Sequence, residues 1–301
     1  MAVIQLALVA ETAEIDFRYL TKVSAALQKQ LARDFGPIWE IAATIDAFHS
    51  LDDVPVGYWP LIVVDDVQGA EGIHQDRHGQ PYALVELGDD WSLTASHEAI
   101  EMLVDPWGRK LVPGVSAKAG QGRVEYLVEP CDPSESAQFG YTANGILVSD
   151  FYTPHFFDPY AAKGVRYSFT GALSKPRQVL KGGYLSWHVP KTDHWWQLTW
   201  FDGSKPSFRD IGMLSISGRD SLRSVVKRNT PEQRGILRCK ASRNTDKLFA
   251  SARSSSDVST ASKASSWREE IRELLEAAPV ASGSRSSPRS KRSSRAVGRR
   301  S

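Results

Sequence analysis

Residues 90–106 read DWSLTASHEAIEMLVDP, and the rest of the chain is interpreted outward from this stretch. Most of its residues favour a helix, and His97, Glu101 and Asp105 follow one another at intervals of four. Residues at i and i+4 lie one above the other on a helix, so these side chains should share one face and converge where one cation could bind. Glu98 would point to the edge of that site.

The order His97-Glu98-x-x-Glu101 is the H-E-x-x-H helix of metallopeptidases with a glutamate in place of the second histidine. In the parent motif both histidines hold zinc, and the glutamate is the general base. We therefore expect His97 and Glu101 to be metal ligands, with Asp105 as a further candidate, and Glu98 to be catalytic. Zn²⁺ is the expected ion, and the carboxylate ligand leaves Ca²⁺ or Mn²⁺ as alternatives.

An ordinary core helix is the alternative interpretation of this stretch. Apolar residues at 93, 100 and 102–104 predict a packed helix, and Asp105-Pro106 predicts its end, because the residue before a proline is pushed out of the α region. Charged groups on a buried helix need partners, and a cation would supply one.

The composition is that of a globular protein, with 301 residues of which 41% are apolar. Residues 279–301 hold seven Arg or Lys and no acid, so the total charge of +2 less these seven leaves about −5 for the preceding 278 residues. Cys131 and Cys239 are too few for a thiolate metal site, so imidazole and oxygen ligands are expected.

The N-terminal ten residues are apolar but lack the basic residues of a signal peptide, and we expect a first strand there. No apolar run approaches the ~20 residues of a membrane span. The expected protein is therefore without a membrane span and cytoplasmic.

The order of elements before the motif is the next guide to the fold. The patterns predict a helix at 19–35 and strands at 41–48, 59–67 and 82–87. Residues 69–81 are expected to be an exposed connection, although His74, Asp76 and His78 alternate there and could share one side of an extended segment. This order resembles the upper half of zincin metallopeptidases, in which a helix and a mixed sheet precede the active-site helix.

Three acids downstream of the helix could complete a metal site. A short strand over 123–129 would present Glu125 and Glu129 on one side, and Asp132 follows three residues later. The other interpretation is that these glutamates pair with Arg123 or Arg109 on a solvated strand face.

The segment Ser96-His97-Glu98-x-x-Glu101-x-x-x-Asp105-Pro106, followed by Glu129-x-Cys131-Asp132, resembles a zincin-like group of largely uncharacterised proteins. The plant exordium-like proteins share the pattern. The resemblance covers residues 91–132 and, as architecture, 1–215. In zincins whose third ligand is a glutamate, that ligand lies downstream of the helix, which favours Glu129 over Asp132 and Glu125. This chain departs from the pattern because Cys131 precedes Asp132.

Residues 136–216 are expected to be rich in β-structure. Asn144-Gly145 predicts a hairpin over 141–152, and strands are expected near 182–188 and 194–201. Tyr152 and His155 follow the hairpin and could donate a hydrogen bond to an oxyanion at a zincin metal. The aromatic residues around them could equally be core.

Beyond residue 216 the composition changes. Residues 217–250 are a polar extension, and residues 251–301 contain 16 serines, so we expect a disordered Ser/Arg-rich tail with a short helix at 266–278. The tail could contact nucleic acid or another anionic surface.

The sequence therefore predicts an α+β fold: a zincin-like mixed sheet with an N-terminal helix and the metal-motif helix in residues 1–135, a β-rich aromatic portion packed on it in 136–216, the polar extension and the basic tail. The leading hypothesis is a zinc-dependent, zincin-type hydrolase acting on a peptide or protein substrate. The alternative is a non-catalytic binding or structural module stabilised by the same ion.

Overall fold

The computed structural model describes residues 2–67, 71–77, 79–216 and 221–230. These residues form an α+β fold built on two five-stranded sheets, which confirms the expected fold class. Most of the polar extension and the whole Ser/Arg-rich tail, with its expected helix at 266–278, lie outside the described residues.

The first sheet is mixed, as expected, and its strands run in the order β2-β1-β3-β5-β4. Neighbours among β2, β1, β3 and β5 are parallel, whereas β4 runs antiparallel to β5 at the edge. Its strands are β1 Ile4–Ala10, β2 Ala43–Phe48, β3 Trp59–Val64, β4 Gly72–Arg77 and β5 Gln80–Glu86.

Strand β4 corrects the expectation of an exposed connection over residues 69–81. It pairs with β5 from Gly72 opposite Val85 to Arg77 opposite Gln80, and the side chain of His74 is fully buried. The polar composition hid the strand because pairing with β5, and not local hydrophobicity, holds it in place.

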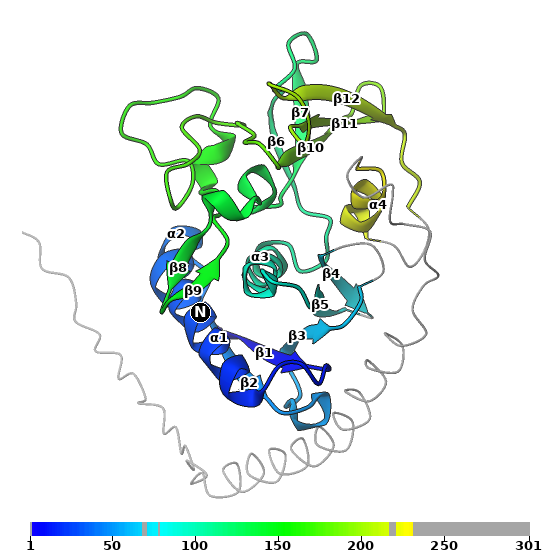
Figure 1. Ribbon diagram of the computed structural model, residues 1–301. Coiled ribbons are helices and arrows are strands. Elements are labelled where there is room, and N and C mark those ends of the chain that lie inside the picture. The colour runs from blue at the N-terminus through cyan, green and yellow to red at the C-terminus, as the bar shows by residue number, and fades with distance from the viewer. Residues whose placement is uncertain (1, 68–70, 78, 217–220, 231–301) are drawn as a thin grey trace, which may run out of the picture. The chain divides into compact units, whose positions relative to one another are not determined.

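Helices α1 Phe17–Lys29 and α3 Trp91–Val104 cover one face of the first sheet (Figure 1). Leu6 and Leu8 of β1 face the core shared with α1 and α3, while Ala7 and Val9 face the other side of the sheet. The helical segments before and including the motif helix are α1 Phe17–Lys29, the π-helical turn η1 Gln30–Phe35, α2 Gly36–Trp39, the 3₁₀ turn η2 Leu51–Asp53 and α3 Trp91–Val104.

The second sheet is antiparallel, in the order β12-β11-β10-β7-β6. Its strands are β6 Leu111–Val115, β7 Arg123–Leu127, β10 Tyr184–Val189, β11 His194–Thr199 and β12 Ser207–Gly212. We expected one portion of the fold to end at residue 135 and the next to begin at 136. Strands β6 and β7 precede that boundary and β10, β11 and β12 follow it, so both portions contribute strands to this sheet.

The expected hairpin at Asn144-Gly145 is present between β8 Tyr141–Ala143 and β9 Ile146–Val148. Both turn residues have positive φ, 51° and 78°, which is the backbone that this dipeptide favours. The chain then passes α3, where the backbone N–H of Ser149 donates to Ser96 Oγ at 2.7 Å. The 3₁₀ turns of this region are η3 Asp132–Ser134, η4 Ala137–Phe139 and η5 Pro154–Phe157.

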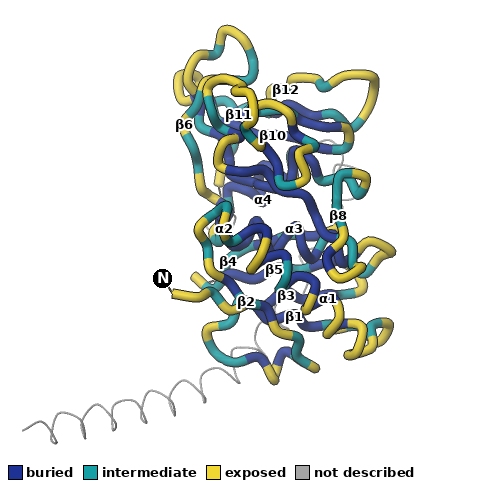
Figure 2. Tube along the Cα trace, turned by 90° about the vertical axis from the view of Figure 1, so that its left-hand side faces the viewer, coloured by how far each residue is buried: buried dark blue, intermediate teal, exposed yellow. Residues whose placement is uncertain are grey.

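Helix α3 lies at the centre of these layers, and Thr94 is its one residue that is not buried (Figure 2). A helix that is buried all round needs partners for each of its polar side chains. α3 ends at Val104, as the Asp105-Pro106 signal predicts.

A short helix, α4 Leu222–Arg228, packs Leu222 and Val226 against Leu127 and Trp195. It falls inside the stretch expected to be a polar extension. In the part of the chain that the structure describes, no helix combines the length and the apolar character needed to cross a bilayer.

Candidate metal centre

His97 and Glu101 lie on one face of α3, as their spacing predicts. His97 Nε2 is 3.2 Å from Glu101 Oε1, and both side chains are buried. The pair therefore presents one imidazole nitrogen and one carboxylate oxygen to the same point.

The segment after β7 brings the preferred downstream acid, Glu129, and the next candidate, Asp132, to this region. Asp132 Oδ1 is 3.3 Å from His97 Nε2, and ligand oxygens of Glu101, Glu129 and Asp132 lie within 4.8 Å of one another. The backbone N–H of Cys131 donates to Glu101 Oε1 at 3.3 Å, which ties this segment to α3.

Several buried polar atoms of this region make no hydrogen bond. In the described part of the chain, six buried side-chain polar atoms have no hydrogen-bond partner, and four of them belong to this region: His97 Nε2, Glu129 Oε1, Asp132 Oδ1 and Tyr152 Oη. Such atoms are costly and rare in native interiors. Together with the contacts of His97 Nε2 to Glu101 and Asp132 and the grouping of the Glu101, Glu129 and Asp132 oxygens, this is what a site for a cation would show, so these residues fit a metal.

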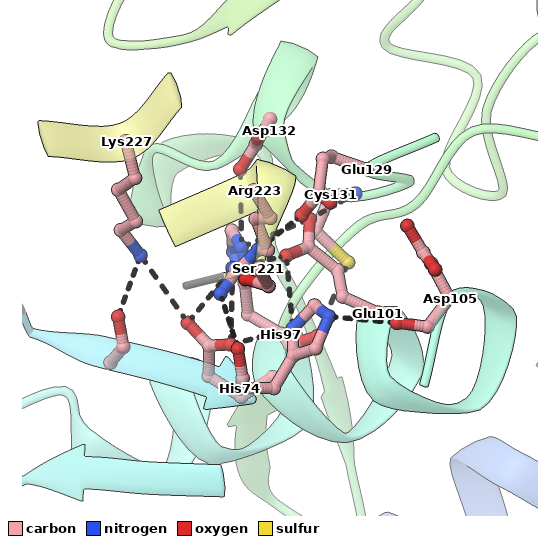
Figure 3. Close-up of polar contacts among 12 residues, drawn as sticks. His74, His97, Glu101, Asp105, Glu129, Cys131, Asp132, Ser221, Arg223 and Lys227 are labelled. Atoms are coloured by element: carbon pink, nitrogen blue, oxygen red, sulfur yellow. Dashed lines mark hydrogen bonds and ion pairs between the residues drawn. The ribbon is translucent and has the colours of Figure 1, made fainter. Parts of the chain in front are cut away.

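Arg223 and Lys227 of α4 reach the same cluster from the other side (Figure 3). Arg223 Nη2 donates to Glu101 Oε2 at 2.6 Å and to Glu98 Oε2 at 3.1 Å, and Arg223 Nε donates to Glu129 Oε2 at 2.5 Å. Lys227 Nζ is 3.5 Å from Glu98 Oε1 and donates to the carbonyl of Gly72 at 2.6 Å.

Glu98, the expected general base, is held by these cations and by a histidine. Its Oε2 lies 3.2 Å from His74 Nδ1, and His74 Nε2 lies 3.1 Å from the carbonyl oxygen of Asp105. Both nitrogens of His74 are thus engaged, so another of the four groups of possible ligands among the described residues, His74 with Glu98 and Glu101, has little free capacity for an ion.

The carboxyl groups of the cluster differ in the direction of their pKa shifts. Burial would raise the pKa of Glu98, but Arg223 and Lys227 outweigh it and hold that pKa far below the ordinary value. Burial and the charge on Glu101 instead raise the pKa of Asp132, and burial likewise raises that of Glu129 despite Arg223. Burial opposes a charge on His97, yet Glu101 and Asp132 raise its pKa well above the ordinary range.

The carboxylates of the cluster, Glu98, Glu101, Glu129 and Asp132, outnumber its permanent cations. Four buried carboxylates meet two buried side-chain cations, Arg223 and Lys227. Two more positive charges are needed, and either two protons or one divalent ion can provide them.

Tyr152 also belongs to this region. Its ring is fully buried, and burial together with the charges of Glu129 and Glu101 raises the pKa of its hydroxyl well above the ordinary value. The hydroxyl therefore keeps its proton and can donate a hydrogen bond.

Three expected site residues lie elsewhere. Asp105 follows the last helical residue with non-helical dihedral angles, so its carboxylate leaves the shared face and accepts from the backbone N–H of Lys110 at 2.7 Å. Glu125 pairs with His188 across β7 and β10 at 3.0 Å. His155 is exposed and pairs with Asp158 at 2.9 Å, and no contact among the described residues joins it to the cluster.

The sequence patterns did not indicate that Arg223 and Lys227 reach the site, or that His74 is buried there. His74 alternates with Asp76 and His78, but the polar composition of residues 69–81 favoured an exposed connection. Ser221 caps α4 by accepting from Ser224 N, and a serine before Leu222, Val225 and Val226 is a helix signal that could have been used.

Comparisons with family models, with curated proteins and with solved structures found no match for this chain. The function is therefore argued from the geometry of the cluster.

Proposed function

We propose that this protein binds one divalent cation, zinc in first place, through His97, Glu101, Glu129 and Asp132. The proposal rests on two observations: His97 Nε2 faces a carboxylate oxygen of Asp132 at 3.3 Å, and ligand oxygens of Glu101, Glu129 and Asp132 lie within 4.8 Å of one another. Glu101 Oε1 completes the set at 3.2 Å from the imidazole.

The spacing and the donor types suit zinc. Ligand atoms at 2.0–2.1 Å from a tetrahedral zinc are about 3.3 Å apart, and the two measured separations from His97 Nε2 are 3.2 and 3.3 Å. Calcium prefers six to eight oxygens at longer distances and no imidazole. Manganese accepts the same donors and stays the alternative.

We infer that this ion stabilises the fold. Four protein donors around one ion leave no open position, which is the mark of a structural zinc site. Glu98 is also held by Arg223, Lys227 and His74 in the described conformation, so its carboxylate has no freedom to take a proton from a substrate or a water.

A zincin-type hydrolase of peptide bonds is the second candidate, and Tyr152 favours it. Its hydroxyl makes no hydrogen bond, and burial and the charges of Glu129 and Glu101 raise its pKa, so it could donate to a developing oxyanion. Zinc with an open position would supply Lewis acidity. In that function Glu98 would have to leave Arg223 before it could act as the base.

Elemental analysis of the purified full chain tests the proposal. We expect about one zinc per chain in the wild type, and its loss in His97→Ala. Asp105→Asn is the matched control, because Asp105 is a buried acid of the same motif whose carboxylate faces Lys110. A wild type without metal, or His97→Ala with full zinc, would rule the proposed site out.

A further inference from the structure

Through its side chain, Arg223 contacts two of the four proposed ligands, Glu101 and Glu129, at their Oε2 atoms. It comes from α4, more than ninety residues beyond the last ligand in the sequence, and its side chain is 3% exposed. A guanidinium carries five N–H donors in a planar fork, so it can donate hydrogen bonds to several acceptors at once.

The contacts of Arg223 divide each ligand carboxylate into an outer and an inner oxygen. The Oε2 atoms of Glu101 and Glu129 accept from Arg223 at 2.6 and 2.5 Å. This leaves Glu101 Oε1 beside His97 Nε2, and Glu129 Oε1 without a partner. One guanidinium thereby fixes the rotation of two carboxylates whose remaining oxygens can face the ion.

Arg223 is itself held by groups that are not ligands. Its backbone N–H donates to the carbonyl of Gly108 at 2.8 Å, and its Nη1 lies 3.4 Å from the carbonyl oxygen of His74. Leu222 and Val226 anchor the helix on Leu127 and Trp195. The backbone of Arg223 and the helix that carries it are therefore held by groups other than the proposed ligands.

We propose that Arg223 is the positioning residue of the metal centre, holding Glu101 and Glu129 so that one oxygen of each is presented to the ion. The inference rests on the proposed function, since it concerns the same site. Outer partners of this kind tune metal affinity by orienting the ligands, and their loss typically weakens binding about 10- to 100-fold.

The charge of Arg223 by itself would have the opposite effect on zinc affinity. A positive charge beside an anionic site repels a cation, so its removal should tighten zinc binding. Lys227 supplies the matched control, because it lies one turn further along α4 and carries the same charge. Its ammonium contacts Glu98 and the carbonyl of Gly72 but none of the four proposed ligands.

The experiment is a competitive zinc titration of the chelator-stripped full chain against a zinc indicator, in the wild type, Arg223→Gln, Arg223→Lys and Lys227→Gln. We expect both Arg223 variants to bind zinc about 10- to 100-fold more weakly. Arg223→Lys should fail to restore affinity because an ammonium cannot bridge two carboxylates as a fork does. Lys227→Gln should bind zinc as tightly as the wild type, or more tightly.

Cobalt substitution adds a readout that a general loss of stability would not change. The visible absorption of bound Co²⁺ reports its coordination geometry. We expect the spectrum at saturation to change in Arg223→Lys and to stay as in the wild type in Lys227→Gln. Circular dichroism of each variant shows whether it is folded, and Arg223→Lys keeps the charge if Arg223→Gln does not fold.

Equal or tighter zinc binding by folded Arg223 variants would overturn the inference and make Arg223 a competitor of the ion. The two proposals can fail separately. A wild type that binds no zinc removes the site itself, whereas a zinc-binding wild type with unaffected Arg223 variants removes the positioning role alone.

Discussion

Glu98 shows at the scale of one residue how a motif and its surroundings can disagree. The sequence places it where a metallopeptidase has its general base, and the structure surrounds it with Arg223, Lys227 and His74. A base needs a pKa near the working pH and access to the proton it takes. Here the two neighbouring cations hold the pKa of Glu98 far below its ordinary value.

Replacing Glu98 by glutamine should therefore act on stability. We expect zinc content to be unchanged and the free energy of unfolding to fall by about 3 kcal/mol, because Arg223 and Lys227 lose their shared buried partner. Urea unfolding measures this change. Glu125→Gln, in a half-exposed pair with His188, should cost less than about 1 kcal/mol. A peptidase activity that disappears in Glu98→Gln would instead favour the hydrolase.

Tyr152 allows a second prediction at this scale. Its buried hydroxyl has no partner, so in the metal-free protein Tyr152→Phe should leave stability unchanged or raise it by about 1 kcal/mol. Tyr126 is the control, since its hydroxyl accepts from Ala117 N and donates to Val115 O, and Tyr126→Phe should cost about 1 kcal/mol or more. Thermal unfolding after chelation compares them, and an equal loss in both variants would contradict the assignment.

At the scale of elements, the metal centre depends on a segment that is neither helix nor strand. Glu129 follows the end of β7, and Asp132 begins the 3₁₀ turn η3. The segment is tied down by backbone contacts, including Tyr152 N to Pro130 O at 2.7 Å and Leu180 N to Pro133 O at 2.9 Å. Gly183 also packs closely against the backbone of Asp132 and Pro133.

Gly183 tests how closely that segment is held. A Cβ at Gly183 would lie 2.5 Å from the carbonyl oxygen of Asp132 and 2.6 Å from that of Pro133, and backbone atoms cannot yield as a flexible side chain can. We expect Gly183→Ala to lower the melting temperature and to weaken zinc binding by moving Asp132. Gly88→Ala, with open space around its Cβ, should change neither. Calorimetry with zinc titration checks both, and unaltered zinc affinity in Gly183→Ala would count against a role for Asp132.

At the scale of the molecule, the proposed ion would join α3 to the segment that leads from the second sheet. Its removal should destabilise the whole fold. At a free zinc concentration about 100 times the Kd, binding adds ~2.7 kcal/mol, so chelation should lower the melting temperature by roughly 5–10 °C. Differential scanning calorimetry with and without a chelator measures the shift. His97→Ala should show none, and an unchanged wild-type melting temperature would contradict a stabilising ion.

The seven basic residues of 279–301 support a separate prediction, because their charge differs from that of the preceding chain. If they form an arm for nucleic acid, exchanging all seven for glutamine in the full chain should abolish binding to a duplex of mixed sequence. Binding by the wild type should weaken steeply as salt is raised. Zinc content should be the same in both proteins. Duplex binding that survives the exchange would exclude the tail as the binding element.

Local sequence patterns were sufficient to predict the elements that are determined by residues close together in the chain. The four-residue spacing and the Asp105-Pro106 stop predicted α3, and Asn144-Gly145 predicted its hairpin, because helix periodicity and turn chemistry involve near neighbours. The convergence of His97 with Glu101 follows from one helix face. The resemblance favoured Glu129 over Asp132 as the downstream ligand, and the structure brings both acids to the site.

Only the tertiary structure decided the elements and partners that exist through distant contacts. Strand β4 is polar and forms by pairing with β5, and α4 is short and held by its packing. Arg223 lies 122 and 94 positions from Glu101 and Glu129. No periodicity links residues so far apart, since their meeting depends on how the layers pack. The motif helix was therefore readable from the sequence, while the surroundings that determine the chemistry of Glu98 were not.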